Sequence, residues 1–269
     1  MAQIRPYTRP VNWPTTAAEA IAVQQQLRDQ VDRTDHGGPP RYAAGLDVAY
    51  DGDRLAAAIV VLDWETLAEV DRAVVPGRTA FPYVPGLFAF REVPALLSAL
   101  EQLTTTPDLL VCDGQGIAHP RRFGLASHLG VLTGIPSIGV AKTAFVGTHA
   151  EPGPTRGATA DLTLDDEVVG AVVRTQDRVK PVYVSIGHRV SLPTAIRHTL
   201  HLAPRYRLPE TTRAADRLCR AGLVAGGLAG EGEHAVEGDL GVVLGVGVNL
   251  DRVDDVPGDQ VLQGPDQVR

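Results

Sequence analysis

The sequence contains little of what would mark a secreted or membrane protein. It has two cysteines, Cys112 and Cys219, and their separation matches no metal or redox motif. No apolar run approaches the roughly 18 residues of a membrane span, and Pro14 interrupts an N-terminus without an apolar signal core. Because unpaired cysteines suit a reducing compartment, we expect a cytoplasmic protein.

Lysine is almost absent, with only Lys142 and Lys180 in the chain. The formal net charge of −7 is unfavourable for a nucleic-acid-binding protein, but most of the excess acid falls after residue 213. Charge therefore neither establishes nor excludes a nucleic-acid partner. With 269 residues, 44% of them hydrophobic, the chain can bury a sizeable core.

The hydrophobic pattern predicts three strands in quick succession, followed by alternating helices and strands. The predicted elements are a helix at 15–32, strands at 42–50, 54–63 and 67–75, a helix at 88–103, a strand at 109–112, a helix at 122–133, strands at 135–140, 167–174 and 181–186, and a helix at 192–202. This order predicts an α/β fold that resembles ribonuclease H. Its mixed β-sheet has three antiparallel strands and then parallel strands, and helices flank it.

The C-terminal part of the sequence differs in composition from the rest. It is rich in glycine, valine and acidic residues, with possible strand fragments at 241–249. We therefore predict a main domain over 1–216 and a poorly ordered extension over 217–269.

Three carboxylates lie in segments that otherwise look like core: Asp47 in an apolar strand, Glu92 in an apolar helix, and Asp113 at the end of a strand. A buried carboxylate is costly to ionise unless a positive charge lies beside it. Together the three predict a site for Mg²⁺ or Mn²⁺, which prefer hard oxygen ligands. Taken singly, backbone donors could hold Asp47, Arg91 or Arg122 could pair with Glu92, and Asp113 could form an Asp-Gly turn.

Other candidate site residues follow the predicted strands. Lys142 comes after the strand at 135–140 and His188 after the strand at 181–186, while His119 and Arg121 lie in a loop before a helix. Lys142 and Arg121 at such positions suit phosphate binding, since ligands of α/β folds bind at the carboxyl ends of strands, while His188 could bind a metal or orient a water. The alternatives are a surface charge for Lys142, a turn cap for His188 and a solvated loop for the others.

The segment Pro82-Tyr83-Val84-Pro85-Gly86 carries an aromatic side chain between two prolines that stiffen the backbone. A rigid aromatic residue on a loop can wedge into a base stack and hold open the gap that a flipped nucleotide leaves. On its own, such a segment is more often a simple turn.

Taken together, these motifs resemble the endonuclease V family, the inosine-specific repair nucleases. The resemblance covers about residues 15–216. The matching segments are Gly45-Leu46-Asp47-Val48-Ala49-Tyr50, Pro82-Tyr83-Val84-Pro85-Gly86 continuing to Phe90-Arg91-Glu92, Asp113-Gly114-Gln115-Gly116 with His119-Pro120-Arg121, Gly139-Val140-Ala141-Lys142, Gly187-His188-Arg189-Val190-Ser191, and Arg207-Leu208-Pro209-Glu210.

The resemblance implies a ribonuclease H-like catalytic domain that depends on Mg²⁺, with Mn²⁺ as a substitute. It implies a DNA-repair enzyme, expected to be monomeric, that hydrolyses the second phosphodiester 3′ to deoxyinosine and leaves 3′-hydroxyl and 5′-phosphate ends. By motif match, the metal ligands are Asp47, Glu92 and Asp113, the catalytic helpers Lys142 and His188, and the substrate-binding residues Pro82, Tyr83, Gly86, Gly114, His119 and Arg121.

Two departures and three alternatives accompany this resemblance. Gln115 stands where many relatives have histidine, and the sequence after about residue 216 matches nothing in the family pattern. A structure-specific nuclease of the same fold, an endoribonuclease specific for inosine in RNA, and a non-catalytic nucleic-acid-binding protein are the competing functions.

Overall fold

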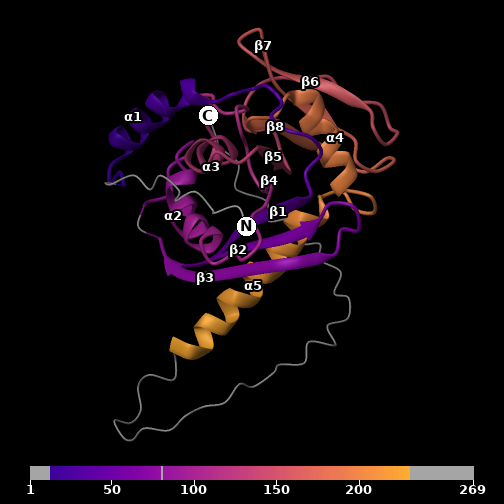
Figure 1. The fold of residues 1–269 in the computed structure, drawn as a ribbon. Helices are drawn as coiled ribbons and strands as arrows, with labels where there is room; N and C mark the ends of the chain where they lie inside the picture. Colours follow the sequence, from indigo (N-terminus) through magenta and orange to yellow (C-terminus); the bar gives the residue numbers. More distant parts are fainter. Residues whose placement is uncertain (1–12, 80, 231–269) are drawn as a thin grey trace, which may run out of the picture. The chain divides into compact units, whose positions relative to one another are not determined.

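The computed structural model of the chain describes residues 13–79 and 81–230, which form one mixed sheet flanked by helices (Figure 1). The sheet has eight strands in the order β3-β2-β1-β4-β5-β8-β7-β6. The strands are β1 (Tyr42–Asp51), β2 (Arg54–Asp63), β3 (Glu69–Arg78), β4 (Leu109–Cys112), β5 (Ser137–Ala141), β6 (Thr159–Leu164), β7 (Glu167–Val173) and β8 (Val182–His188). Strands β1, β4 and β5 are parallel, and the other neighbouring pairs are antiparallel.

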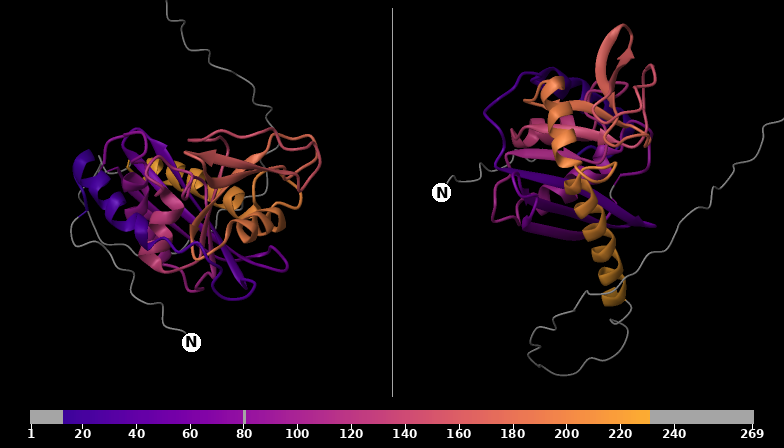
Figure 2. Two further views of the ribbon diagram at one scale, coloured as in Figure 1. Left: turned by 90° about the horizontal axis from the view of Figure 1, so that it is seen from above. Right: turned by 90° about the vertical axis from the view of Figure 1, so that its right-hand side faces the viewer.

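Helices cover both faces of this sheet. They are α1 (Ala17–Leu27) with the short 3₁₀ turn η1 (Arg28–Gln30), α2 (Ala89–Leu100), α3 (Leu125–Thr133), α4 (Leu192–Leu202) and α5 (Glu210–Gly230). Helices α2 and α3 pack on one face, whereas α4 and α5 pack on the other. The C-terminal part of α5 extends past the sheet (Figure 2). No helix in the described ranges is long and apolar enough to cross a membrane.

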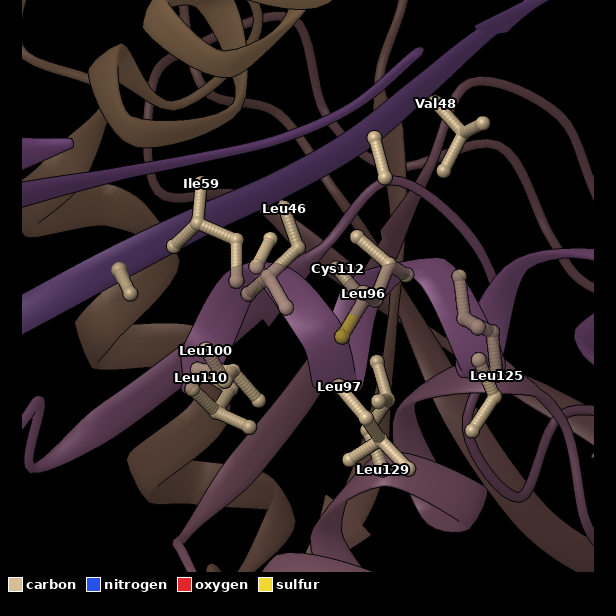
Figure 3. Close-up of a cluster of buried hydrophobic side chains, with 14 of the residues drawn as sticks. Leu46, Val48, Ile59, Leu96, Leu97, Leu100, Leu110, Cys112, Leu125 and Leu129 are labelled. Carbon is tan, nitrogen blue, oxygen red and sulfur yellow. The ribbon is translucent and has the colours of Figure 1, made fainter. Parts of the chain in front are cut away.

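The main core lies between the sheet and the pair α2 and α3. Leu46, Ile59 and Leu110 of the sheet meet Leu96 of α2 and Leu129 of α3 there (Figure 3). Alternate residues of a strand point to opposite faces, so Ala43 and Val111 belong to a second core under α4. Each fully buried leucine, isoleucine or valine side chain in these cores contributes roughly 1.5–3 kcal/mol to folding stability. The two cores therefore hold the strands of the sheet in place.

Gly45 allows α5 to lie directly on β1. A Cβ atom at this position would sit 2.0 Å from the carbonyl oxygen of Thr211, so only glycine fits there. The N-terminal part of α5 therefore crosses β1 beside Asp47.

The predicted order of strands and helices is confirmed, with small shifts at the ends of elements. The pattern missed β6, and it missed α5, which runs through the predicted boundary at residue 216 to Gly230. The compact unit extends to Gly232. The remainder of the predicted extension, including the possible strands at 241–249, lies outside the described residues.

Candidate active site

Asp47 and Asp113 lie side by side because of the register between β1 and β4. The last parallel pair of these strands is Leu46 with Cys112, and the two aspartates are the next residues along each strand. The N–H of Asp113 donates to the Leu46 carbonyl at 3.3 Å, which continues the alignment. The sequence therefore places two carboxylates at the carboxyl edge of the parallel strands, as predicted.

Glu92 approaches the same edge from α2. Its side chain is buried, with 4% of the residue exposed, and its Oε1 accepts a hydrogen bond from the Tyr50 hydroxyl at 3.1 Å. Arg122, one of the predicted alternative partners, instead pairs with Glu167 and Asp165. The carboxylate of Glu92 is therefore not committed to a buried ion pair with Arg122.

The three carboxylates share one electrostatic environment. Burial, with the nearby charge of Asp113, raises the pKa of Asp47 to about 7. Burial also raises the pKa of Glu92 well above its usual value, and the charges of Asp47 and Asp113 add to that rise. Removing carboxylates from water while placing like charges together is unfavourable, so this edge attracts a cation.

Lys142 supplies one cation at this edge. It follows β5, and its Nζ lies 2.5 Å from Oδ2 of Asp113. Burial disfavours its charged form, but the hydrogen bond and charge of Asp113, with the charges of Asp47 and Asp216, outweigh that effect and raise the pKa of Lys142. Lys142 thus lies at the carboxyl end of β5, where the sequence pattern placed it, and the structure adds its contact with Asp113.

Asp216 is a fourth carboxylate that the sequence pattern missed. It lies on α5, near enough for its charge to raise the pKa values of both Asp47 and Lys142. Arg220, one turn along the helix, contacts its Oδ1 at 2.9 Å. The packed face of this helix carries the buried residues Thr211, Ala215 and Cys219, which recur every four residues but give only a weak hydrophobic pattern in the sequence.

The donor set at this edge fits a divalent metal ion in its chemistry. Asp47, Glu92 and Asp113 offer only oxygen ligands, which Mg²⁺ and Mn²⁺ prefer. As the side chains stand, they turn to separate partners: Asp47 accepts from the backbone of Val48, Glu92 accepts from Tyr50, and Asp113 contacts Lys142. Within the described residues, no group of three or more Asp, Glu, His or Cys side chains is arranged to hold an ion. Binding a metal would therefore require these side chains to turn from their present partners.

A small cavity opens directly beside Asp113. Its volume is about 200 Å³. Its walls are the start of α2, the loop after β4 and the segment Pro82-Tyr83-Val84-Pro85-Gly86, which is called the wedge loop below because Tyr83 is predicted to enter a base stack. The lining residues are Gln24, Tyr83, Pro85, Gly86, Phe88, Ala89, Asp113, Gly114, Gln115, His119, Gly124, Leu125 and Phe145. Of the predicted substrate-binding residues, Tyr83, Gly86, Gly114 and His119 line the cavity, while Pro82 precedes Tyr83 in the same loop.

The wedge loop is held in shape at the carbonyl of Gly86. This oxygen accepts hydrogen bonds from Gln24 Nε2 at 3.0 Å, His119 Nε2 at 2.9 Å and Arg121 Nη2 at 2.7 Å. Nδ1 of His119 accepts the N–H of Arg121, and burial lowers the pKa of His119 to about 4, so the ring is a neutral donor at Nε2. Arg121 therefore contributes to the site by holding the wedge loop, and it does not line the cavity. The contact of Gln24 of α1 with the same carbonyl was not predicted from the sequence.

Tyr83 is exposed on this loop, with 68% of the residue accessible. Its ring lies 6.2 Å from that of Phe88, in an edge-to-face arrangement. An aromatic side chain that is exposed, and whose ring is held by contact with a second ring, can enter a base stack.

The position of His188 differs from the one predicted from the sequence. Strand β8 runs antiparallel to β5, so its last residue His188 pairs with Ser137 at the beginning of β5, on the edge opposite to Lys142. There its Nδ1 accepts the N–H of Asp32 at 3.1 Å. The catalytic role predicted for His188 came from the motif match and from its place after a strand, but the antiparallel pairing of β8 puts this residue at the edge opposite to Lys142.

Gln115 lies in the loop that contains Gly114. Its Nε2 donates to the Thr143 carbonyl at 3.0 Å, which joins the loop after β4 to the segment after Lys142. Its Oε1 is buried and accepts no hydrogen bond from the described residues.

Comparisons with known proteins match the same region of the chain. The profile of the endonuclease V family matches residues 25–217. The curated endonuclease V of Nocardia farcinica is 61% identical over 220 residues, covering 80% of this chain and 96% of the relative. That of Streptomyces coelicolor is 59% identical over 218 residues, covering 80% and 94%.

Solved structures show the same fold. The crystal structure of endonuclease V from Streptomyces avermitilis is 55% identical, with a TM-score of 0.78 over 81% of this chain and 97% of that one. Endonuclease V from Ciona intestinalis, in complex with DNA containing an inosine followed by a ribo-adenosine, is 29% identical, with a TM-score of 0.67 over 77% and 98%. The ribonuclease H-like fold is therefore confirmed. The family profile and the curated endonuclease V relatives also confirm the prediction of an enzyme. On its sequence and its fold alike, this chain belongs to the endonuclease V family of nucleases.

Proposed function

We propose that this nuclease hydrolyses the second phosphodiester 3′ to deoxyinosine in DNA, leaving 3′-hydroxyl and 5′-phosphate ends, in the repair of deaminated adenine. The observation that carries the proposal is that Asp113 belongs both to the carboxylate cluster and to the wall of the small cavity. A base held in the cavity therefore has its own backbone beside the carboxylates. The inosine-containing DNA bound to the Ciona relative supports the same substrate class.

The cavity suits recognition of hypoxanthine through backbone groups. Gly86 and Gly114 line it, and both have a positive φ, which glycine adopts without a Cβ clash. Hypoxanthine differs from adenine by one ring N–H and one carbonyl, so a pocket with fixed backbone donors and acceptors can separate the two bases. Tyr83 would fill the gap that the flipped base leaves in the base stack.

The chemistry is metal-assisted hydrolysis, in which Asp47, Glu92 and Asp113 hold Mg²⁺, or Mn²⁺ in its place. When bound, the ion supplies Lewis acidity that polarises the phosphate and lowers the pKa of the attacking water. Lys142 adds a positive charge where negative charge develops on the phosphate, and its hydrogen bond to Asp113 places it beside the carboxylates. His188 has no part in this proposal, because it lies on the opposite edge.

The proposal needs one copy of the chain. Asp47, Glu92, Asp113, Lys142 and the cavity all come from a single compact unit, which supports a monomeric enzyme. Both cysteines are free and buried, which suits a reducing compartment and supports a cytoplasmic location.

A nicking assay on matched DNA strands, with and without one inosine, tests this function directly. We expect cleavage only of the inosine strand, with Mg²⁺ or Mn²⁺ and not with EDTA. Asp113→Ala should abolish cleavage and leave binding of the inosine strand measurable, while the exposed control Asp161→Asn should cleave normally. Equal cleavage of the inosine-free strand, or a fully active Asp113→Ala enzyme, would contradict the proposal.

Inosine in RNA is the second candidate substrate. The nucleic acid in the Ciona complex carries a ribo-adenosine directly after the inosine, so that relative accommodates a 2′-hydroxyl at this position. Matched RNA strands in the same assay decide between the two substrates by their relative cleavage rates.

A further inference from the structure

A second cleft, separate from the base cavity, lies next to Lys142. Its volume is about 520 Å³, and it is formed by the loop between β7 and β8 together with the segment between α4 and α5. The lining residues are Arg156, Gln176, Asp177, Val179, Arg205, Tyr206 and Arg207. None of these residues lines the base cavity.

Arg207 joins this cleft to the catalytic edge. Its guanidinium donates to the carbonyl of Lys142 at 2.6 Å, to that of Pro181 at 2.8 Å and to that of Lys180 at 3.0 Å. The residue that contacts Asp113 is therefore bonded through its own backbone to the wall of the cleft.

The cleft carries a local excess of positive charge. Arg156 and Arg207 hydrogen-bond only backbone carbonyls through their guanidinium groups, so no carboxylate neutralises them within the described residues. Arg205 is exposed and likewise has no ion pair in the described part of the chain. The one acidic side chain in the lining, Asp177, accepts the backbone N–H of Arg156 at 2.6 Å.

Two exposed cations, Arg178 and Lys180, extend the positive surface along the β7–β8 loop. The whole chain has a formal net charge of −7, so composition alone does not explain this concentration of cations. Phosphate groups are the ligands that such a surface attracts.

Tyr206 adds an aromatic side chain to the cleft. The residue is 46% exposed, and the guanidinium of Arg213 lies 3.6 Å from its ring centroid. Grooves that combine cations with exposed aromatic residues bind single nucleic-acid strands, because cations follow the backbone and rings contact bases.

The positions of the cleft and the base cavity indicate the direction in which a bound nucleic-acid strand would run. The cavity is walled by residues of α2 and α3, on one face of the sheet, while the cleft is walled by the segment between α4 and α5, which pack on the other face. The carboxylates lie at the sheet edge between them. If the base occupies the cavity and the cleaved bond is on its 3′ side, the strand beyond that bond continues toward the cleft.

We propose that this cleft binds the sugar–phosphate backbone of the substrate strand on the 3′ side of the cleaved bond. The proposal rests on the proposed function, which supplies the strand and its direction. Arg205 and Lys180 contact phosphates there, while Arg207 and Arg156 hold the walls in position.

The test measures binding by full-length Asp113→Ala protein, which should not cleave. Inosine strands that end directly after the second 3′ nucleotide are compared with strands that continue for about ten more, a length within the range of single-strand sites. We expect the double variant Arg205→Gln and Lys180→Gln to bind the long strand about tenfold more weakly and the short strand unchanged. The dependence of log affinity on log salt should fall by about 1–2 for the long strand.

Two controls separate charge from damage to the fold. The charge-preserving pair Arg205→Lys and Lys180→Arg should retain most of the affinity for the long strand. The pair Arg28→Gln and Arg72→Gln removes the same number of charges from exposed ion pairs elsewhere and should bind both strands normally. An equal loss on both lengths, no loss on either, or the same loss in the matched control overturns the cleft proposal.

The outcome stays distinct from that of the proposed function. Equal binding of inosine and adenine strands would contradict inosine recognition, whereas the role of the cleft is judged from the ratio between long and short strands. If the double variant keeps its inosine preference and shows no length effect, the proposed function stands and the proposed role of the cleft in strand binding is contradicted.

Discussion

At the scale of the residue, Asp216 shows how the site depends on charges outside the predicted metal ligands. It raises the pKa values of Asp47 and Lys142, although it lies on a helix that the sequence pattern did not predict. We therefore expect Asp216→Asn to slow cleavage by about 10–100-fold, the range found when groups that support metal ligands are removed. Single-turnover nicking rates across a metal titration would measure it. Asp161→Asn, an exposed change of the same kind, should have no effect, and an Asp216→Asn enzyme with normal rates would rule the role out.

His128 should make the fold sensitive to acid. It is completely buried on α3 among the rings of Trp13, Phe90 and Phe123, and neither ring nitrogen has a hydrogen-bond partner in the described residues. Burial lowers the pKa of His128 to about 3, from 6.5. Because the unfolded chain takes up a proton below about pH 6.5 and the folded chain does not, folding stability falls as the pH drops below that value.

The expected size of this effect is about 2 kcal/mol of unfolding free energy lost between pH 7 and pH 5. His128→Phe removes the titrating group and keeps a ring in the same place, so it should lose less stability over this range by about that amount. Urea unfolding at both pH values measures the difference. His36→Gln, which changes an exposed histidine, should not reduce the loss, and an unchanged pH dependence in His128→Phe would contradict the argument.

The residues that could and could not be predicted differ in one physical respect. Asp113 and Lys142 directly follow the parallel strands β4 and β5, so the sequence rule that places strand ends together worked for them, while Asp47 lies within β1 just past its last parallel pair with β4. His188 also ends a strand, but β8 is antiparallel, and strand direction is set by long-range pairing that no local pattern contains. Gln24 could not be placed either, because its contact with Gly86 joins segments 62 residues apart.

At the scale of the element, the packing of α5 on β1 controls the position of Asp216. Gly45 leaves the space that Thr211 needs, and a methyl group there would meet the helix backbone. Backbone cannot move aside as a flexible side chain can, so Gly45→Ala should cost about 1–3 kcal/mol of stability or more. It should also slow cleavage, since α5 must shift away from Asp47.

Thermal unfolding and nicking rates of Gly45→Ala and Gly38→Ala test this contact. A Cβ at Gly38 would meet nothing within 4 Å, so that variant should behave as the wild type does. If Gly45→Ala were as stable as Gly38→Ala, α5 could not lie as close to β1 as the structure places it.

Elements with strong periodic patterns were predicted, while those that depend on context were not. Strand β2 is an almost continuous apolar run and was found from the sequence, whereas β6 has mainly exposed or half-exposed residues and is defined by its pairing with β7. Helix α5 escaped prediction because small residues dominate its packed face: Gly222 lies against Val74, and Ala215 is buried. Small residues give weak hydrophobic periodicity even where a helix packs tightly.

At the scale of the whole molecule, the proposed base cavity and the proposed strand-binding cleft lie on either side of the carboxylate edge. The base cavity is held by α2 and α3, the basic cleft by the segments around α4 and α5, and the parallel strands place the carboxylates between them. If both proposals hold, the mixed sheet separates the site of base recognition from the site of strand binding. The net negative charge of the whole chain is compatible with this arrangement, because Arg156, Arg205 and Arg207 give the cleft a local excess of positive charge.

The limit of the folded unit can be tested by truncation. The family profile ends at residue 217, but α5 continues to Gly230 and still contributes the buried Cys219 and the contact of Gly222 with Val74. Ending the chain after Arg217 should therefore lower the unfolding free energy by roughly 2–4 kcal/mol, the value expected for exposing a few packed side chains and the surface beneath them. Ending it after Gly232, where the compact unit ends, should leave stability unchanged. Urea unfolding of both truncations and of the full chain measures this, and equal stability of the shorter truncation and the full chain would place the boundary at residue 217 instead.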